Sequence, residues 1–471
     1  MSQSSRKSLA RLGVFSVVMI TVGSVDSIRN LPTAALFGAH LVVFYLLSAA
    51  MFLLPAAFVS AELSAIHDRE SGIYMWVRSA FGRSAAWMAI WFQWIENVIW
   101  YPAILSFVAG SIAYVIHPSL VHNSWYMLVT VLASFWLVTL INCFGVKVSA
   151  RFAAIGTIIG LLIPFTIIIG LGLAWCIANH PLAIDLSDAW RWGSLSHASS
   201  WVAITGIMLS FGGIEIATVH SGDVKNPKKT YPIALAISVF ILLFTLIFGS
   251  LSVAIIVPVH QLSLVAGILQ AAELCFKFYH LEWLLPILAS LIVVGALGEV
   301  NNWIIAPARG LLQAAESQVL PQVFCQTNRH GAPVPILIAQ AIIVSAVALV
   351  FVVFPSVNES YWFLTALASQ LYMFMYIFMF LALLRLRMKS KSLNANGYCI
   401  PGGSAGLYLC TALGCFSCVF TIFIGFIPPR TFLGHGSMHY TVVLVVGLLA
   451  MIALPLVLYV FGSRSEGQPN D

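Results

Sequence analysis

The chain alternates long apolar runs with short polar connections over almost its whole length. Roughly 20 apolar residues suffice for one transmembrane helix, and the pattern predicts twelve such spans. Their approximate bounds are 11–37, 40–65, 86–116, 125–146, 152–178, 200–220, 232–257, 283–314, 335–355, 361–386, 404–427 and 438–462. We therefore expect residues 1–462 to form one all-α polytopic membrane domain, followed by a short tail at 463–471.

Two of the runs contain polar, glycine-bearing interruptions. Residues 21–32 have the sequence TVGSVDSIRNLP, and residues 210–217 have the sequence SFGGIEIA. Inside a bilayer every backbone group needs a hydrogen-bond partner, so a span can unwind only where it is buried in protein or lines a cavity. We therefore expect spans 1 and 6 to be broken, which is typical of the binding site of a transporter.

The charge distribution predicts the orientation of these spans. The chain is 61% hydrophobic and 8% charged, with a mean hydropathy of +0.98. Of its 22 Lys and Arg residues, 18 fall in one set of alternate connections, three in the other, and Arg29 inside the first span. Because positively charged loops stay in the cytoplasm, we expect both termini and the tail to be cytoplasmic. The net charge of +6 thus reflects topology, and no nucleic-acid partner is expected.

The twelve predicted spans divide into two sets of five and a final pair. The first set covers about 11–178, the second about 200–386, and the accessory spans 404–462. The two sets have opposite orientation, and each begins with a broken span. The second connection is amphipathic in both sets, at 66–83 and at 258–282. This is the pattern of an inverted repeat.

Several short motifs resemble one family of membrane proteins. They are AEL at 61–63, ESGIYMWV at 70–77, LSFGGIEIA at 209–217, NPKKTYP at 226–232, GALGEVNNWIIAPARG at 295–310, GAPVP at 331–335 and IPGG at 400–403. In this order they resemble the amino acid, polyamine and organocation (APC) transporters. The likeness covers nearly the whole chain and is closest to the bacterial glutamate/GABA antiporter branch.

The resemblance implies a LeuT-type fold of ten helices in two inverted halves, with spans 11 and 12 added. It implies an integral protein of the bacterial inner (plasma) membrane that exchanges one amino acid for an amine or another amino acid. In such a fold the substrate carboxylate lies on free N–H groups at the break of span 1, and the ammonium lies on free carbonyls at the break of span 6. The resemblance is also compatible with a homodimer.

Site residues follow from the interruption of span 1, from the motifs of spans 6 and 8, and from charged or aromatic residues inside span 3. Those expected to bind substrate are Gly23, Val25, Asp26, Ser27, Ile28, Phe211, Gly212, Gly213, Glu299 and Trp303. Those expected to act in coupling or gating are Arg29, Glu96 and Glu215, and Trp100 is a further candidate cavity aromatic.

Asp26 and Arg29 depart from the family pattern, which has small residues at this turn. Charges at membrane depth are costly and usually mark function. The spacing permits the two side chains to pair with each other. If they do not pair, Asp26 in the cavity would favour a cationic substrate or carry a proton, whereas Arg29 would favour an acidic side chain. The sequence leaves these alternatives open.

The other buried polar candidates also have two interpretations. Glu215 either acts in transport or ties span 6 to a neighbouring helix. Glu96 is either a proton site or one partner in a hydrogen bond between helices. Trp303 either flanks the substrate or serves only packing.

Enzymatic and metal-binding motifs are not convincing in this chain. Residues 402–406 match G-x-S-x-G, but a nucleophile elbow needs a strand before its helix. Cys415 and Cys418 lack the His partners of a zinc site. No nucleotide-binding loop is present, so transport must draw on gradients. We expect no enzyme activity, cofactor or metal. The leading hypothesis is an amino acid antiporter, the alternative is a proton-coupled symporter or importer, and an amino acid-sensing receptor is more remote.

Overall fold

The computed structural model describes residues 13–66, 72–145, 152, 155–187, 201–216, 218, 224, 226–317, 320–354, 356–389, 398–428 and 437–464. Within these ranges the chain forms helices joined by short turns, with no β-strand element. The all-α polytopic fold class is therefore confirmed. The predicted tail from residue 465 onward and Ala217, the last residue of the span 6 interruption, lie outside the described residues.

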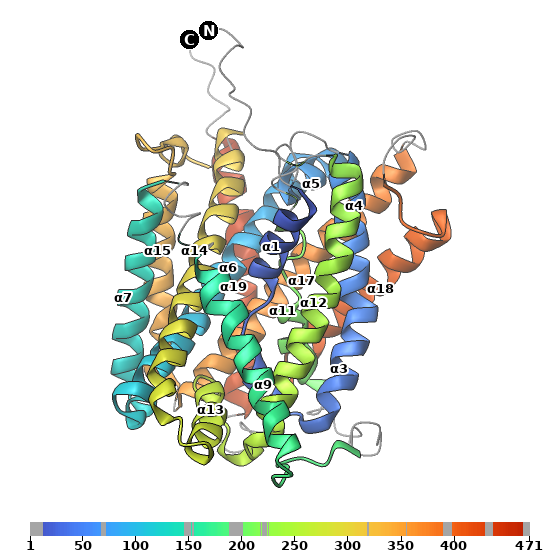
Figure 1. Cartoon of the computed structure of the whole chain (residues 1–471). Helices are drawn as coiled ribbons and strands as arrows, with labels where there is room; N and C mark the ends of the chain where they lie inside the picture. The colour runs from blue at the N-terminus through green and yellow to red at the C-terminus, as the bar shows by residue number, and fades with distance from the viewer. Residues whose placement is uncertain are drawn as a thin grey trace, which may run out of the picture.

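Ten described helical segments are long and apolar enough to cross a membrane, which fits an integral membrane protein (Figure 1). They are Gly38–Ile66, Arg83–Ile116, Ser124–Cys143, Ile155–Ile177, Lys229–Ile256, Glu282–Glu316, Val334–Val353, Val357–Lys389, Gly403–Ile424 and Tyr440–Tyr459. Each coincides with one predicted span. The two predicted spans outside this set are those with interruptions, so the count of twelve stays a prediction.

The individual helices are named as in Figure 1. They are α1 (Val14–Val25), α2 (Asn30–Ala35), α3 (Leu41–Ser48), α4 (Leu54–Ile66), α5 (Ile73–Phe81), α6 (Arg83–Ile116), α7 (Ser124–Cys143), α9 (Ile163–Ile177), α11 (Ala203–Ser210), α12 (Pro227–Ile256), α13 (Gly267–Phe278), α14 (Leu285–Glu316), α15 (Val334–Ala348), α16 (Val350–Val353), α17 (Val357–Lys389), α18 (Gly403–Ile424) and α19 (Ser437–Arg464). A π-helical turn, Ala49–Leu53, joins α3 to α4, and another, Ile158–Leu162, leads into α9.

The first interrupted segment contains two short helices. The N–H of Asp26 donates to the carbonyl of Val22 at 2.8 Å, and the backbone of Asp26 then turns to the extended region, with φ −73° and ψ 126°. The N–H of Asn30 donates to the carbonyl of Ser27 at 3.1 Å, which starts α2. Residues 26–29 therefore lie between two helix ends.

The second interrupted segment begins where α11 ends at Ser210. Residues 211–215 form turns, and Gly213 has a φ of +102°, a conformation that glycine adopts readily and other residues rarely. Gly213 therefore allows the chain to leave the helix direction here.

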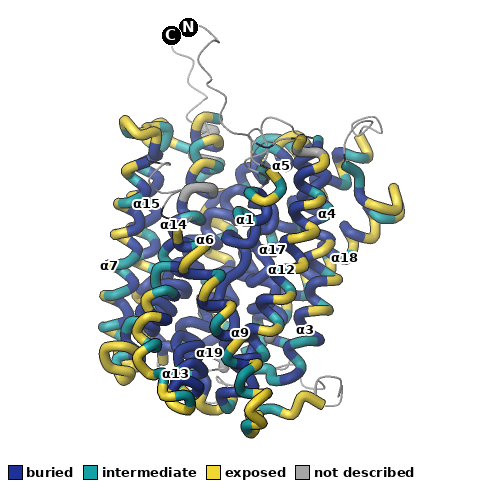
Figure 2. Tube along the Cα trace, in the orientation of Figure 1, coloured by how far each residue is buried: buried dark blue, intermediate teal, exposed yellow. Residues whose placement is uncertain are grey.

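The interior of the bundle is built around α6, which packs against α14 and α17, while α12 packs against α1 and α9. Figure 2 shows buried residues concentrated along the centre and exposed residues on the outer faces and at both ends. Large apolar side chains such as Phe240 and Phe423 are exposed on those outer faces, as expected for surfaces that contact lipid. The fold thus buries α1, α6 and α11 at its centre.

A close helix crossing brings the region before α9 against α14. A Cβ built on Gly160 would lie 2.1 Å from the Cα and N atoms of Gly295, and one on Gly156 would lie 2.8 Å from the Cα of Gly298. Small residues permit this approach of two backbones, as is common between membrane helices.

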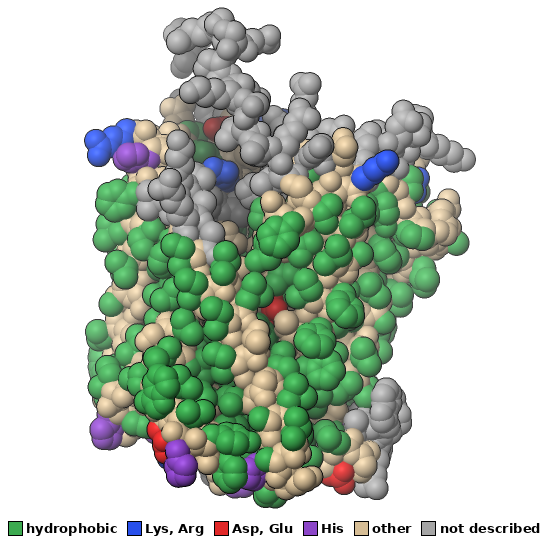
Figure 3. All heavy atoms as spheres, viewed as in Figure 1, with side chains coloured by type: hydrophobic (Ala, Val, Ile, Leu, Met, Phe, Trp, Pro, Cys, Tyr) green, Lys and Arg blue, Asp and Glu red, His purple; other side chains and the backbone are tan. Residues whose placement is uncertain are grey.

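Basic side chains gather at one end of the bundle. Figure 3 shows Lys and Arg at the upper end of this face, above a broad hydrophobic band. At one buried point, Glu62 at the end of α4 pairs with Arg387 of α17 at 2.6 Å and accepts from the N–H of Ile400 at 2.7 Å. This contact fixes the end of α17 to α4 and to the segment before α18.

Candidate functional site

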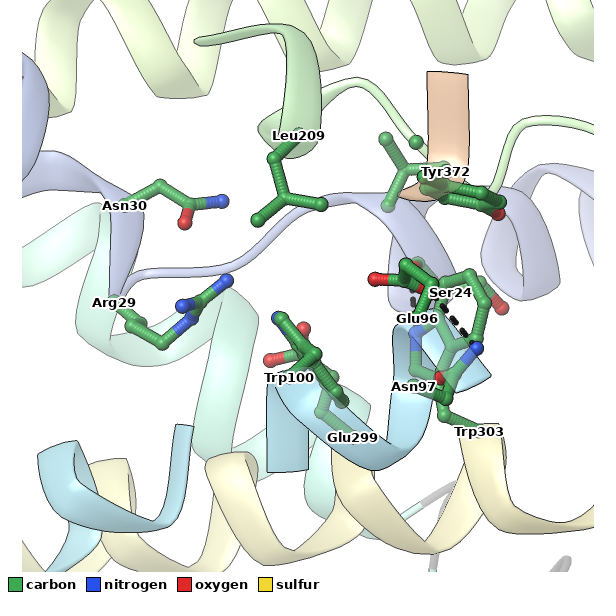
Figure 4. A pocket seen from close by; sticks show the side chains of 12 residues that line it. Ser24, Arg29, Asn30, Glu96, Asn97, Trp100, Leu209, Glu299, Trp303 and Tyr372 are labelled. Atoms are coloured by element: carbon green, nitrogen blue, oxygen red, sulfur yellow. Dashed lines mark hydrogen bonds between the residues drawn. The ribbon is translucent and has the colours of Figure 1, made fainter. Parts of the chain in front are cut away.

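A central cavity lies where the first interrupted segment faces α6, α11, α14 and α17. About 300 Å³ of space in and around it, part of which is open to solvent, is not filled by atoms. Figure 4 shows Arg29 and Asn30 at one end, Ser24, Asn97 and Trp303 at the other, and Trp100 and Glu299 between them. The lining residues are Ser24, Val25, Arg29, Asn30, Glu96, Asn97, Trp100, Leu209, Gly212, Glu299, Trp303 and Tyr372. The cavity therefore combines one guanidinium with two carboxyl groups.

Asp26 turns away from this cavity. Its Oδ2 atom accepts a hydrogen bond from the Thr245 hydroxyl of α12 at 2.7 Å, and its side chain is fully buried. No ion pair joins Asp26 to Arg29 in the described part of the chain, so the pairing alternative does not describe this conformation. Asp26 instead links the interrupted segment to α12.

Arg29 points into the cavity between two aromatic rings. Its guanidinium lies 5.3 Å from the ring centre of Trp100 and 5.8 Å from that of Tyr361. Its Nη1 donates to the Tyr361 hydroxyl at 3.3 Å, while the buried Nε has no hydrogen-bond partner. Aromatic faces attract a cation, but they leave most of the guanidinium donors unused.

The helix α14 fastens the end of α1 through three side chains. Trp303 donates from Nε1 to the carbonyl of Ser24 at 2.9 Å, and Asn302 donates to the Ser24 hydroxyl at 2.9 Å. Ser27 donates from its hydroxyl to Glu299 at 2.8 Å. The Ser24 carbonyl would bond the N–H of Ile28 in an unbroken helix, so Trp303 satisfies an acceptor that the interruption exposes.

Glu96 lies on α6 beside a polar neighbour. Asn97 donates from Nδ2 to Glu96 Oε2 at 2.9 Å and to the carbonyl of Gln93 at 2.7 Å. The Asn97 Oδ1 atom is buried and has no hydrogen-bond partner. Glu96 thus has a local contact on its own helix, and no hydrogen bond from Glu96 to a second helix occurs among the described residues.

Glu215 is held outside the cavity by three donors from other helices. The hydroxyl of Tyr372 donates to Oε1 at 2.8 Å, that of Tyr376 donates to Oε2 at 2.6 Å, and Gln93 donates to Oε1 at 3.0 Å. Tyr376 also accepts from the N–H of Gly213 at 2.9 Å. These contacts tie the turn after α11 to α6 and α17, which favours the second interpretation of Glu215.

The glycines of both interruptions allow close approach. A Cβ on Gly212 would lie 2.4 Å from the Tyr372 ring, and one on Gly213 would lie 2.6 Å from the Trp303 ring. A Cβ on Gly23 would lie 2.7 Å from Thr157. The aromatic walls of the cavity can therefore pack directly on the backbone after α11.

The structure separates the sequence-predicted residues into two groups. Those that line the cavity are Val25, Arg29, Glu96, Trp100, Gly212, Glu299 and Trp303. Those that surround it without lining it are Gly23, Asp26, Ser27, Ile28, Phe211, Gly213 and Glu215. The roles assigned to both groups stay predictions.

Five lining residues were missed by sequence reasoning: Ser24, Asn30, Asn97, Leu209 and Tyr372. Asn97 follows Glu96 directly, and Asn30 follows Arg29, so polar residues next to a charge inside a span were the usable signal. Ser24, Leu209 and Tyr372 are common in any apolar span, and their position depends on how the helices are rotated.

Metal binding has no support in the described residues, because no group of three or more His, Cys, Asp or Glu side chains is placed to hold an ion. No disulfide joins the cysteines of the described ranges. The chemistry available in the cavity is therefore charge pairing, hydrogen bonding and aromatic packing.

Comparisons with known proteins agree with this description. The family model for amino acid permeases matches residues 12–449. An uncharacterized transporter of Legionella pneumophila is 39% identical over 97% of each chain. A glutamate/gamma-aminobutyrate antiporter of Lactococcus lactis subsp. cremoris is 30% identical over 95% of this chain and 90% of the relative. This chain belongs to the amino acid permease family of the APC superfamily, a family of transporters and not of enzymes.

Proposed function

We propose that this protein is a secondary active amino acid transporter that exchanges one amino acid or amine for another by alternating access. The observation that carries the proposal is the central cavity, where Arg29 faces Glu96 and Glu299 between the ends of α1, α2 and α11. A zwitterionic substrate presents one carboxylate and one ammonium, and the cavity offers the opposite charge for each. Helix ends at the interruptions add partial charges of both signs.

Alternating access requires contacts that can open and close around the substrate. The bond from Trp303 to the Ser24 carbonyl joins α14 to α1, and the bond from Ser27 to Glu299 joins α14 to the segment that follows α1. A substrate that takes over Glu299 would release Ser27 and loosen α1 from α14. We therefore assign these two contacts to the step that couples binding to movement of the first interrupted span.

Proton coupling is the second candidate, and it is favoured by the two carboxyl groups that line the cavity. The Lactococcus relative is a glutamate/gamma-aminobutyrate antiporter, which favours exchange in this protein. In the exchange mechanism, the return step needs a bound substrate, so an unlabelled substrate inside a vesicle should accelerate uptake of a labelled one. In the symport mechanism, an inward proton gradient drives accumulation with nothing inside.

Purified protein in proteoliposomes distinguishes these mechanisms. Labelled acidic, neutral and basic amino acids are offered outside, with one unlabelled amino acid or buffer inside and with or without a pH gradient. Exchange predicts uptake that depends on internal substrate and continues after the gradient is collapsed with an ionophore. Uptake into empty vesicles that requires the gradient, and that is lost in Glu96→Gln or Glu299→Gln, would establish symport instead. The absence of uptake of any amino acid under all conditions would contradict the proposed function.

The orientation of the spans and their arrangement as an inverted repeat belong to the same proposal. The 18-to-3 distribution of basic residues supports cytoplasmic termini, and the opposite orientation of the two sets of five spans supports an inverted repeat. Labelling of single cysteines introduced into the loops from either side of the membrane tests the orientation.

A further inference from the structure

Arg29 is a buried cation that forms no ion pair among the described residues, although Glu299 and Glu96 lie near enough to interact with its charge. Its side chain is 2% exposed, and its buried Nε atom makes no hydrogen bond. A guanidinium carries five N–H donors, and among the described residues it forms one hydrogen bond, to Tyr361 at 3.3 Å. Burying a charge is costly unless the charge is paired and hydrogen-bonded. A missing anion is therefore expected beside Arg29.

The nearby carboxyl groups interact with Arg29 through space, but none of them contacts its guanidinium directly. Asp26 accepts from Thr245, Glu299 accepts from Ser27, and Glu96 accepts from Asn97, and all three donors are uncharged. No ion pair to Arg29 occurs in the described ranges. Each acid is therefore held by a neutral group, and the guanidinium stays available to a ligand in the cavity.

The guanidinium of Arg29 lies at one end of the cavity, so the two ends differ in charge. Figure 4 shows Arg29 at one end with its side chain directed toward the middle, where Glu299 lies, and Asn97 and Trp303 at the far end. A ligand carboxylate at the Arg29 end would place an adjacent ammonium near the carboxyl groups of the wall. The far end holds Glu96, to which Asn97 donates, together with neutral groups and no cation among the lining residues, so a second carboxylate on the ligand would find no second cation.

We propose that Arg29 is a specificity-determining residue that binds the substrate carboxylate, and that the cavity selects amino acids with one carboxylate. Dicarboxylic amino acids and amines without a carboxylate are then the disfavoured classes. This inference rests on the proposed transport function and deepens it. Such a site differs from a carboxylate-binding site built from backbone N–H groups alone, because here the charge of a side chain binds the substrate carboxylate.

Three matched ligands test the proposal. Glutamate is 2-aminobutanoate with one added carboxylate, and propylamine is 2-aminobutanoate with its carboxylate removed. Each is added in unlabelled form at pH 7 to proteoliposomes that take up the best labelled substrate found by exchange. For the wild type we expect half-inhibition by 2-aminobutanoate at a concentration at least fivefold lower than by glutamate or by propylamine.

Two variants assign the preference to Arg29. In Arg29→Gln the advantage of 2-aminobutanoate over propylamine should fall at least fivefold, whereas Arg29→Lys, which keeps the charge, should retain part of it. Arg329→Gln is the matched control, because Arg329 is exposed on a loop. A thermal melt in detergent tests whether each variant folds. If Arg29→Gln does not fold, the wild-type comparison and Arg29→Lys decide.

The outcomes separate this inference from the proposed function. Transport with glutamate as the best inhibitor, or an Arg29→Gln profile that changes less than fivefold, overturns the inference and leaves transport intact. A wild type that transports no amino acid overturns both. The expected profile in the wild type together with its loss in Arg29→Gln supports both.

Discussion

The hydroxyl of Tyr376 should stabilise the fold more than that of Tyr372, although both donate to Glu215. In Tyr376→Phe the ring stays in place, 4.7 Å from the ring of Phe52, and only the hydroxyl is lost. That change removes the 2.6 Å bond to Oε2 and also deprives the Gly213 N–H of its acceptor at 2.9 Å. In Tyr372→Phe, Gln93 still donates to the same Oε1 atom.

The magnitudes follow from counting lost and orphaned groups. A hydrogen bond within a membrane bundle contributes about 0.6 to 2 kcal/mol, and leaving a buried donor without a partner costs about 1–3 kcal/mol. Tyr372→Phe loses one bond and orphans no N–H group, so it should reduce the free energy of unfolding by about 1 kcal/mol. Tyr376→Phe loses two bonds and orphans the Gly213 N–H, so it should cost about 2–4 kcal/mol.

Equilibrium unfolding of the purified protein in mixed micelles, at increasing mole fraction of denaturing detergent, measures both values. The double variant should cost less than the sum of the two single variants, because both hydroxyls bind one carboxyl group. If Tyr376→Phe is no more destabilising than Tyr372→Phe, the bond to Gly213 does not stabilise the turn after α11, and the assignment of Glu215 as a tie is wrong.

Two further predictions concern contacts between helices around the site. Gly160→Ala should abolish detergent-stable protein, since its Cβ would lie 2.1 Å from the backbone of Gly295. Gly170→Ala is the control, because a Cβ at Gly170 would meet nothing within 4 Å, and it should be neutral or stabilise the protein by up to about 1 kcal/mol. Equal melting temperatures of Gly160→Ala and Gly170→Ala would contradict the close crossing of the region before α9 with α14. Glu62→Gln should cost about 3 kcal/mol, because it leaves the Arg387 guanidinium without its carboxylate. A change in unfolding free energy below about 1 kcal/mol would show that this pair is effectively solvated.

The sequence predicted the spans well because lipid imposes one simple constraint. Apolar runs of sufficient length located ten helices that the structure also forms. Helix ends were less accurate: α12 begins at Pro227, where the apolar pattern placed the start at 232. Proline is favoured in the first turn of a helix and can extend it beyond the apolar run, a signal that hydropathy does not contain.

The contents of the cavity were predicted only in part. Charges inside an apolar span are conspicuous, so Arg29, Glu96 and Glu299 were found from the sequence. The distant hydrogen-bond partners of the charged residues were not found. The contact of Asp26 with Thr245, for example, joins residues 219 positions apart. Such contacts depend on how far each helix is rotated about its axis, and an apolar pattern that covers a helix on all sides leaves that rotation undetermined.

The central claim is that the cavity between the interrupted spans is the substrate site, and filling the cavity tests it most directly. Leu209 lines the cavity, whereas Ile338 is 43% exposed on the outer surface of α15. Exchange of a labelled amino acid is measured in proteoliposomes for the wild type, Leu209→Trp and Ile338→Trp, each shown to be folded by a thermal melt. We predict that Leu209→Trp loses at least 90% of the exchange rate, a roughly tenfold effect equal to about 1.4 kcal/mol, and that Ile338→Trp keeps it. Undiminished exchange by folded Leu209→Trp would contradict the account.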